Sequence, residues 1–320
     1  MPRLSPAPSL LAVLSLLGVA ALGGCATRED STDGSSDSAG SGNFPVTVQA
    51  QDAPKLTLQQ RPDRIVSLSP TATEVLYKIG AGEQVVAADQ YSTYPEQAPN
   101  KDGVSALKPD PEKLTTFDPD LVVVSSDNGG KLTKQLEKTE VKTLVLPSAP
   151  TLEKAYSQFE LLGKATGHAD AGEKLADTTR RKVESIVEDT PAPEETLTYY
   201  HEVSDDYYTM TSATFVGDVY DRFGLKNIAD GDNPEASGGS PQLSQERIVS
   251  ADPDMIFLSD TKCCGQSAET VSERSGWDTI SAVQHNAIFE LDDDIASRWG
   301  PRVVQFVSTV SDAVTDVTKN

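Results

Sequence analysis

Basic residues, histidine and cysteine are scarce in this chain of 320 residues, and each scarcity argues against a class of protein. Lys and Arg total 27 against 49 Asp and Glu, a net charge of −22, which excludes affinity for a nucleic-acid backbone as the main activity. The three histidines, His168, His201 and His285, are too sparse for a bare-metal receptor, which needs about three imidazoles converging with a carboxylate. Three cysteines cannot build a disulfide scaffold. We therefore expect an acidic globular protein with neither a metal site nor a resident cofactor.

A long hydrophobic run is also missing. The most apolar segment, Leu10–Leu22, has 13 residues, whereas a helix needs about 20 to cross a membrane. Arg3 precedes this segment and small residues follow it, as is typical of a secretory signal. The segment ends in Leu22-Gly23-Gly24-Cys25, which resembles the lipobox of bacterial lipoproteins, where the cysteine carries the lipid. We expect residues 1–24 to be a signal peptide and Cys25 to anchor the chain on the outer face of the cell membrane. The alternative is a plain signal peptide with a chance cysteine.

Two segments of different composition follow the signal peptide. Residues 25–44 are rich in Ser, Gly and Asp without apolar periodicity, which predicts a flexible tether. From residue 45 onward, short apolar runs alternate with helical patterns, which indicates an α/β fold. The apolar runs predict strands at residues 65–68, 84–88, 121–125, 143–146, 197–200, 207–210, 255–259 and 288–291. Near-continuous runs such as residues 121–124 are typical of strands covered on both faces.

Two helices are expected between the halves. Thr151 can cap the first helix, which Gly167 ends. Asp170, with Glu173 three residues later, predicts a capping box at the start of the second helix. This second helix runs to about Glu188 and spans roughly 27 Å, which is long enough to join two lobes. We therefore expect an N-terminal lobe over residues 45–150, a helical segment over 151–189 and a C-terminal lobe over 190–320.

An internal repeat supports two similar lobes. Residues 112–125 align without gaps to residues 246–259, which lie 134 positions later. Each copy has a Glu, a basic residue, a short amphipathic helix, Asp-Pro-Asp and then a buried strand. One Asp-Pro-Asp alone would be a common turn, but two copies in one register predict a duplicated unit.

Three features stand in an order that points to a known family: Arg64–Glu74, then Asp89–Pro95, then the two Glu…Asp-Pro-Asp segments. Together they resemble the substrate-binding proteins of ABC importers for vitamin B12, ferric siderophores and haem. The resemblance covers the chain from about residue 45 to its end. It implies two Rossmann-like α/β lobes bridged by a single long helix, with the ligand held between them and little hinge motion. It also implies a monomer that docks on an ABC permease and reaches the ATPase only through that permease.

The same resemblance gives the repeated glutamates a role. It implies that Glu112 and Glu246, one on each lobe, dock on arginines of the permease. A symmetric permease presents two equivalent sites, and a pseudo-symmetric partner offers one carboxylate to each. The alternative is that each glutamate only favours the first turn of its helix through the macrodipole.

Four tyrosines are candidate ligand contacts. Tyr91 and Tyr94 follow the second expected strand, and Tyr207 and Tyr208 lie near the corresponding strand of the second half. Ligands of parallel α/β lobes lie outside the carboxyl ends of the strands. Tyrosine offers a flat apolar face with one polar handle, which suits a planar or macrocyclic ligand. The alternative is that two of the four are half-buried structural aromatics.

Further candidates lie on three other segments. Arg298 and Trp299 precede the terminal helix and could bind a carboxylate and stack on a ring. For Arg298 the main alternative is an ion pair with the acidic run at residues 292–294. At two positions where vitamin B12 binders have Trp residues in the pocket, this chain has Leu107 and Ser240, which we also take as ligand-binding candidates.

Cys263 and Cys264 are adjacent. Their Cα atoms would lie about 3.8 Å apart, so a vicinal disulfide would be strained. Free or ligand-contacting thiols are the alternative.

These observations predict a membrane-anchored extracytoplasmic receptor that passes a ferric siderophore to an ABC importer. Cobalamin and haem are the alternatives on the same fold, and the absence of tryptophan at positions 107 and 240 places cobalamin after a ferric chelate. An exported hydrolase is disfavoured because the chain has no Gly-x-Ser-x-Gly, His-Glu-x-x-His or P-loop motif. A surface protein that kept the fold and lost its ligand is the third class.

Overall fold

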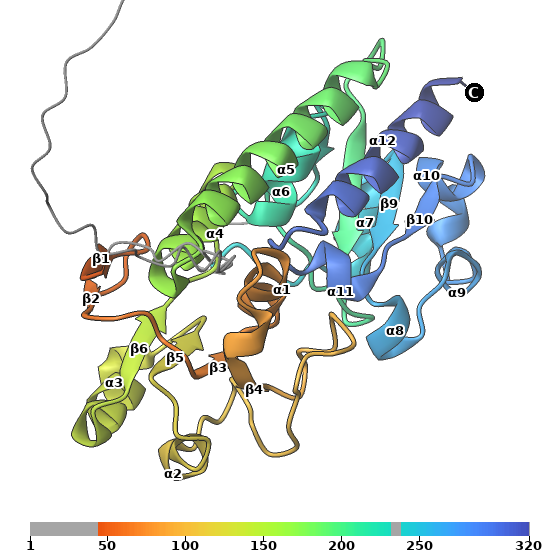
Figure 1. Cartoon of the computed structure of the whole chain (residues 1–320). Helices are drawn as coiled ribbons and strands as arrows, with labels where there is room; N and C mark the ends of the chain where they lie inside the picture. The colour runs from red at the N-terminus through yellow and green to blue at the C-terminus, as the bar shows by residue number, and fades with distance from the viewer. Residues whose placement is uncertain (1–43, 232–237, 320) are drawn as a thin grey trace, which may run out of the picture. The chain divides into compact units, whose positions relative to one another are not determined.

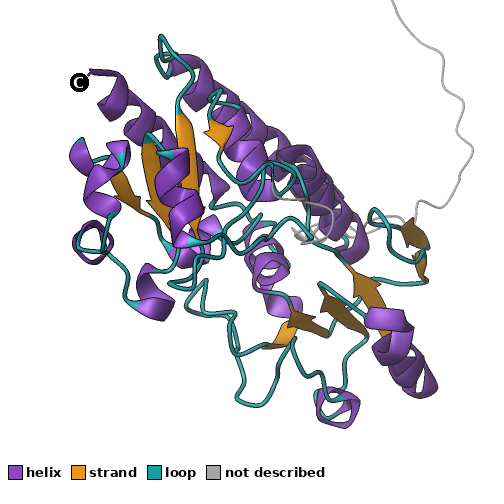
Figure 2. Ribbon diagram, turned by 180° about the vertical axis from the view of Figure 1, so that it is seen from behind, coloured by secondary structure: helices purple, strands orange, loops and turns teal. Residues whose placement is uncertain are grey.

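The computed structural model describes residues 44–231 and 238–319. The signal peptide, Cys25 and nearly all of the expected tether lie outside the described residues. Within them, two four-stranded parallel sheets form, one from residues 65–145 and the other from residues 198–290 (Figure 1). Helices flank both sheets (Figure 2). The expected α/β class with two lobes is confirmed.

Both sheets have the same strand order. The first sheet runs β4 (Val85–Ala88), β3 (Ile65–Leu68), β5 (Leu121–Val124) and β6 (Lys142–Val145). The second runs β8 (Lys226–Asn227), β7 (Thr198–Glu202), β9 (Met255–Leu258) and β10 (Ile288–Glu290). When the strands of each four-stranded sheet are numbered in chain order, the spatial order is second, first, third, fourth in both sheets. The sequence repeat therefore corresponds to a repeated topology.

The repeated Asp-Pro-Asp segments make equivalent contacts. Asp118 and Asp252 both adopt left-handed backbone conformations, with φ of 49° and 46°, just before the central strands β5 and β9. The second aspartate of each segment then caps the start of the neighbouring strand. Asp120 accepts hydrogen bonds from the backbone N–H groups of residues 63 and 64, and Asp254 accepts them from the N–H and hydroxyl of Thr198. Both central strands are fully buried, as their apolar sequences predict.

Two helices join the sheets. Helix α4 (Leu152–Thr166) is capped by the Thr151 hydroxyl and ends at Gly167, whose φ is 81°, as predicted. Helix α5 (Ala169–Asp189) has 21 residues, whereas the predicted length of roughly 27 Å corresponds to 18. It is longer because it begins directly after the tight turn at Gly167 and His168. The predicted Asp170–Glu173 capping box is therefore wrong, since residue 170 already lies inside the first turn and His168 is the N-cap residue.

The remaining described elements surround these parts. They are the hairpin β1 (Val46–Val48) and β2 (Leu56–Leu58), and the helices α1 (Pro70–Lys78), α2 (Pro111–Thr115), α3 (Lys131–Leu136), α6 (Phe215–Asp221), α7 (Gln245–Ala251), α8 (Thr261–Cys264), α9 (Ala268–Ser272), α10 (Ser281–Gln284), α11 (Asp293–Ala296) and α12 (Val303–Lys319), with short 3-10 turns at Gly82–Gln84, Asn128–Gly130, Glu137–Thr139 and Trp277–Thr279.

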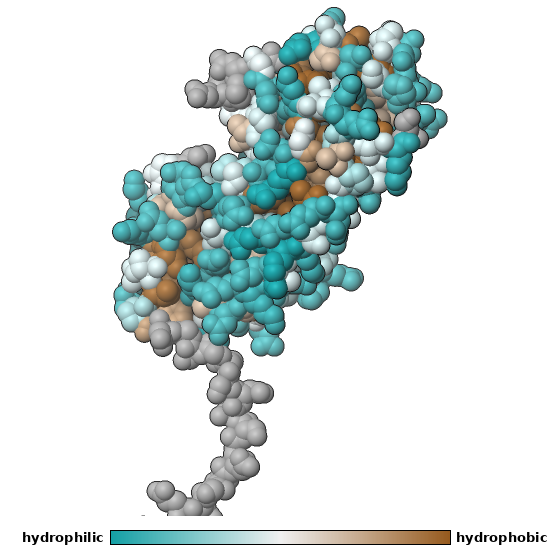
Figure 3. Space-filling view, turned by 90° about the horizontal axis from the view of Figure 1, so that it is seen from above, coloured by the Kyte–Doolittle hydropathy of each residue, from teal (hydrophilic) through white to brown (hydrophobic). Residues whose placement is uncertain are grey.

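One hydrophobic core is shared by the two lobes. Buried side chains run without a break from α1 through α4 and α5 to α6 and α12, including Val75, Phe159, Val183, Tyr220 and Phe306. A second core lies in the C-terminal lobe and a third in the N-terminal lobe. The surface seen from above Figure 1 is mainly hydrophilic, with small apolar patches (Figure 3). None of the described helices has the length and apolar character to span a bilayer.

One predicted strand is wrong. Residues 207–210 form only isolated bridges, Glu202 with Thr209 and Tyr208 with Gln242. Tyr207 has a φ of 66°, which interrupts the extended chain at the start of the apolar run. The edge of the second sheet is instead occupied by β8, a two-residue strand that the sequence did not predict.

Candidate functional site

Four large hydrophobic side chains are exposed in the described part of the chain. They are Tyr91 (48% exposed), Tyr94 (48%), Leu107 (79%) and Tyr208 (43%). All four are sequence-predicted ligand contacts. The two N-terminal tyrosines follow β4, Tyr208 follows β7, and Leu107 lies in the loop before α2. Exposed apolar side chains beyond the carboxyl ends of parallel strands are what a ligand site on this fold requires.

Leu107 lines a hollow in the N-terminal lobe. The hollow has a volume of about 460 Å³ and lies at the carboxyl end of β5, where Ser126 and Asp127 follow the strand. Its other walls come from residues 109–111 and from α3. Asp127 accepts hydrogen bonds from the backbone of Leu132 and Thr133 and from the Thr133 hydroxyl, which hold the pKa of Asp127 below its usual range despite partial burial.

A buried hydrogen-bond network fixes the loop that carries Tyr91. Asp89, which directly follows β4, accepts hydrogen bonds from the Tyr91 backbone N–H at 3.0 Å and from the Ser92 hydroxyl at 2.9 Å. The Ser92 hydroxyl also bonds the hydroxyl of Thr73 in α1 at 3.0 Å. Burial raises the pKa of Asp89, and these hydrogen bonds oppose the rise. The position of Tyr91 is therefore set by its backbone.

An ion cluster joins the two lobes at this loop. Glu74 of α1 is buried and accepts two hydrogen bonds from Arg302, at 3.0 and 2.6 Å, which raise the pKa of that guanidinium. Arg298 lies 3.5 Å from the same carboxylate. Arg298 also pairs with Asp294 at 2.6 Å and donates to the Tyr91 carbonyl at 3.2 Å. The segment between α11 and α12 is thus bound to both α1 and the Tyr91 loop.

This cluster contains one of the two expected contacts of Arg298. The sequence offered an ion pair with residues 292–294 as the main alternative to ligand contact, and the structure contains that pair. The Arg298 side chain is 12% exposed and shared among three acceptors. Trp299 is also engaged, because its indole N–H donates to the Gln158 side chain of α4 at 2.9 Å. In this arrangement Arg298 connects the two lobes, and Trp299 connects the C-terminal lobe to α4.

The carboxyl ends of β7 and β9 bury charge. Glu202, the last residue of β7, is fully buried and forms a bidentate pair with Arg274 at 2.6 Å for both contacts. Asp260, two residues after β9, is also fully buried, and its carboxyl group lies beside that of Glu202. Burial and the nearby Glu202 raise the pKa of Asp260 to about 7. The sequence did not predict this cluster, because nothing in the pattern links positions 202, 260 and 274.

Tyr207 and Ser240 have local partners. The Tyr207 ring stacks on Trp277 with centroids 6.0 Å apart, and the Arg274 guanidinium lies 5.4 Å from the Tyr207 ring centre. Tyr207 is thus the half-buried structural aromatic that the sequence offered as an alternative. The Ser240 hydroxyl donates to the Thr209 carbonyl at 3.1 Å.

Tyr94 and Tyr91 lie in different surroundings. The Arg302 guanidinium lies 4.3 Å from the centre of the Tyr94 ring. Tyr94 lines a hollow between α1, α5 and α12, whereas Tyr91 is joined to Asp89 and Arg298. Arg302 is not an ordinary surface residue of a helix start, because it binds the buried Glu74.

The histidines do not form a site. His201 is buried, and its Nδ1 lies 2.8 Å from the Tyr220 hydroxyl. Burial lowers the pKa of His201 to about 3, so the ring is neutral at physiological pH. Across residues 44–231 and 238–319, no three His, Cys, Asp or Glu side chains converge in a way that could hold a metal ion.

The repeated glutamates occupy equivalent positions. Glu112 is the second residue of α2 after the N-cap Asp110, and Glu246 is the second residue of α7 after the N-cap Ser244. Both are exposed. Hydrogen bonds with its own backbone and with Ser244 lower the pKa of Glu246, so this carboxylate is charged.

Cys263 and Cys264 are free, exposed thiols in α8. Desolvation, the hydrogen bond with the Cys264 thiol and the charge of Asp293 raise the pKa of Cys263 to about 12. The backbone N–H groups of Thr261, Lys262 and Cys263 all donate to Asp293, which joins α8 to α11.

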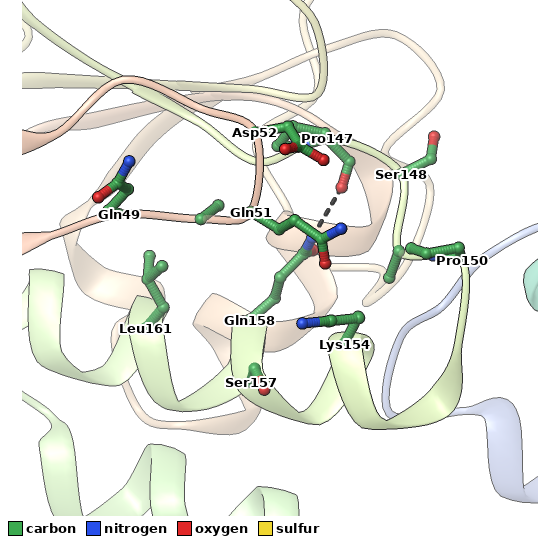
Figure 4. Close-up of a pocket in the computed structure, with 12 residues that line it drawn as sticks. Gln49, Gln51, Asp52, Pro147, Ser148, Pro150, Lys154, Ser157, Gln158 and Leu161 are labelled. Atoms are coloured by element: carbon green, nitrogen blue, oxygen red, sulfur yellow. Dashed lines mark hydrogen bonds between the residues drawn. The ribbon is translucent and has the colours of Figure 1, made fainter.

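A further hollow has a volume of about 570 Å³ and contains none of the predicted ligand contacts. It lies between the residues after β1, the loop after β6 and α4 (Figure 4). On its wall, the Gln158 amide donates to the Pro147 carbonyl at 2.7 Å, and the Gln158 oxygen accepts from Trp299. Gln158 thus joins a wall of this hollow to Trp299.

Comparison with known proteins gives consistent results. Residues 65–295 match the model of the periplasmic binding protein family. The chain is 29% identical to an uncharacterized ABC transporter substrate-binding lipoprotein, YvrC, of Bacillus subtilis, over 93% of this chain and 94% of the relative. It is 26% identical to a cobalamin-binding protein of Halobacterium salinarum, over 86% of this chain and 76% of the relative. A solved structure of a possible iron-binding (periplasmic solute-binding) protein from Staphylococcus epidermidis is 28% identical, with a TM-score of 0.69, covering 80% of this chain and 99% of that one.

Proposed function

Because this chain belongs to the periplasmic binding protein family, we propose that it captures a corrinoid of the cobalamin class at the carboxyl ends of its two sheets. The chain is a substrate-binding receptor of an ABC importer and not an enzyme. The choice of ligand rests on one observation, the engagement of Arg298. Its guanidinium is shared among Asp294, Glu74 and the Tyr91 carbonyl, so it offers no free charge to an anionic chelate.

The surroundings of the site support the same choice. The chain as a whole carries a net charge of −22. An anionic ferric chelate or haem would be repelled unless a local cation compensated. Cobalamin carries no pair of carboxylates, so it would not be repelled in this way. The exposed Tyr91, Leu107 and Tyr208 suit its broad macrocycle. A relative is also named as a cobalamin-binding protein.

A ferric chelate is the second candidate. The phenols of Tyr91 and Tyr208 are exposed at the strand ends, and the Staphylococcus epidermidis relative is described as possibly binding iron. Leu107 and Ser240, where vitamin B12 binders have tryptophans, favour this candidate too. It requires Arg298 to leave Asp294 or Glu74 when the ligand arrives.

The two ligands are separated by titration of the purified protein. Tryptophan and tyrosine fluorescence, checked by calorimetry, is followed with cyanocobalamin, a catecholate and a hydroxamate ferric siderophore, and haemin. We expect saturable binding of cyanocobalamin at least tenfold tighter than that of any anionic chelate. Tighter binding of a ferric siderophore or haemin would contradict the corrinoid proposal, and Arg298→Ala would then have to weaken that binding.

We further propose that Cys25 carries a lipid and that the tether leaves the lobes free. Members of this family act outside the cytoplasm, and the Bacillus subtilis relative is named a lipoprotein. Cys25→Ala should release the protein from the membrane fraction with ligand binding unchanged. Retention of the variant in the membrane fraction would contradict the anchor.

A further inference from the structure

A hollow of about 280 Å³ lies where α1, α5 and α12 meet, and we name it the three-helix hollow. Its walls come from the N-terminal lobe through α1, from the joining helix α5, and from the C-terminal lobe through α12 and the residues before it (Figure 1). It does not contain Tyr91, Leu107 or Tyr208, so it is distinct from the candidate ligand site.

The three-helix hollow is basic in an acidic protein. Lys78, Lys182 and Arg302 line it, and Glu74 is its one acidic lining residue. Glu74 is already bound by Arg302 at 3.0 and 2.6 Å. Lys78 and Lys182 are exposed and have no hydrogen-bond or ion-pair partner among the described residues. Two uncompensated cations thus face one hollow in a chain whose net charge is −22.

Neutral hydrogen-bond donors stand beside these cations. The Thr178 hydroxyl, the Gln305 amide and the Tyr94 phenol all line the hollow. None of the three has a side-chain hydrogen bond within the described residues. The Tyr94 ring packs under the Arg302 guanidinium, with 4.3 Å between that group and the ring centre, which fixes one wall. Charged and neutral donors converging on one space are the groups that bind oxyanions.

We infer that the three-helix hollow binds a small, multiply charged oxyanion of the phosphate or polycarboxylate class, held by Lys78 and Lys182. Since liquid water occupies about 30 Å³ per molecule, the hollow has room for an anion of this size. Because its walls belong to both lobes and to α5, the bound anion stabilises one arrangement of the lobes. This inference does not depend on which ligand binds at the strand ends.

The test is calorimetric titration of the purified protein with inorganic phosphate and with citrate at constant ionic strength, using chloride as the balancing salt. We expect saturable binding of at least one anion and a rise in melting temperature with its concentration. Lys78→Ala/Lys182→Ala should weaken that binding at least tenfold. Lys174→Ala, an exposed lysine of α5 that does not line the hollow, should leave it within twofold.

Three results would overturn the inference. The first is an absence of saturable binding of both anions to the wild-type protein. The second is unchanged binding in the Lys78→Ala/Lys182→Ala variant, which would place the anion elsewhere. The third is retention on phosphatidylglycerol vesicles without binding of either free anion, which would make the surface a membrane contact. Circular dichroism and cyanocobalamin binding of the double variant establish that it is folded.

Discussion

The two lobes have the same strand order, but their strands end in different chemistry. In the N-terminal lobe, Asp89 accepts from the Ser92 hydroxyl, which also bonds the Thr73 hydroxyl, and the chain beyond the strands exposes Tyr91 and Leu107. In the C-terminal lobe, the strand ends bury Glu202 against Arg274 and place the buried Asp260 beside Glu202. Three of the four exposed large hydrophobic side chains belong to the N-terminal lobe and one, Tyr208, to the other.

Equivalent positions of the two lobes therefore have different roles. The N-terminal lobe offers apolar surface on a loop held by hydrogen bonds to Asp89, which suits contact with a ligand. The C-terminal lobe holds itself together around a buried ion pair and supplies Arg298 and Arg302, which bind Glu74 of the other lobe. A duplicated fold thus leaves each copy free to specialise, because topology constrains the strands and not the side chains that follow them.

The largest expected effect is on the buried ion pair of the C-terminal lobe. Arg274→Ala would leave the fully buried Glu202 unpaired and should lower the free energy of unfolding by about 3–5 kcal/mol. Ser92→Ala, which removes one hydroxyl from the network of the N-terminal lobe, should cost only about 1 kcal/mol. Urea denaturation followed by circular dichroism measures both. Equal losses would show that the two lobes do not differ in this way.

The second effect is a pH dependence that belongs to the C-terminal lobe. The pKa of Asp260 is raised to about 7, whereas an unfolded aspartate has a pKa of about 3.9. The folded state therefore binds this proton more tightly, so the free energy of unfolding should fall as pH rises from about 4 to about 7. The loss is of order a few kcal/mol, since each tenfold change in acidity corresponds to about 1.4 kcal/mol.

Asp260→Asn should remove this part of the pH dependence, because the amide does not ionise. Asp278→Asn, an exposed aspartate of the same lobe, is the matched control and should retain the wild-type profile. Urea denaturation at a series of pH values gives the comparison. A wild-type profile for Asp260→Asn would mean that other groups carry the pH dependence.

The smallest expected effect on binding is at the glutamates that the lobes share. Glu112 and Glu246 lie at the same position of equivalent helices, so each substitution by Ala should reduce uptake of the ligand by cells. Ligand affinity should change less than twofold, because neither residue lies near the exposed tyrosines in the sequence or lines the Leu107 hollow. If one substitution alone abolished uptake, the two lobes would not dock equivalently. A tenfold loss of ligand affinity would place that glutamate in the binding site.

Much of the fold was predictable because its signals are local. Buried strands such as residues 121–124 have continuous apolar sequences, and Thr151 and Gly167 mark the ends of α4. The repeat predicted equivalent lobes because Asp120 and Asp254 must cap equivalent strands. The errors also have local causes. Tyr207 has a positive φ at the start of an apolar run. The turn at His168 lets α5 begin one residue before the expected cap, Asp170.

Residues of the candidate site were predictable only where their place in the sequence indicates an exposed side chain. Tyr91, Leu107 and Tyr208 could be selected because they follow strands or align with family pockets. The pair of Arg298 with Asp294 could be expected because the two residues lie four positions apart, whereas its contact with Glu74, 224 positions away, could not. Long-range pairs of this kind depend on how the lobes pack, and no spacing in one sequence encodes them.

We propose that the ligand binds at the strand ends beside Tyr91. Tyr91 and Tyr94 are equally exposed, at 48% each, yet only Tyr91 is joined to Asp89 and Arg298, while Tyr94 lines the three-helix hollow. The most direct test is titration of the wild type, Tyr91→Ala and Tyr94→Ala with cyanocobalamin. We predict that Tyr91→Ala weakens binding by about tenfold, equivalent to about 1.4 kcal/mol, and that Tyr94→Ala stays within twofold. Unchanged affinity in Tyr91→Ala, or an equal loss in both variants, would contradict the claim.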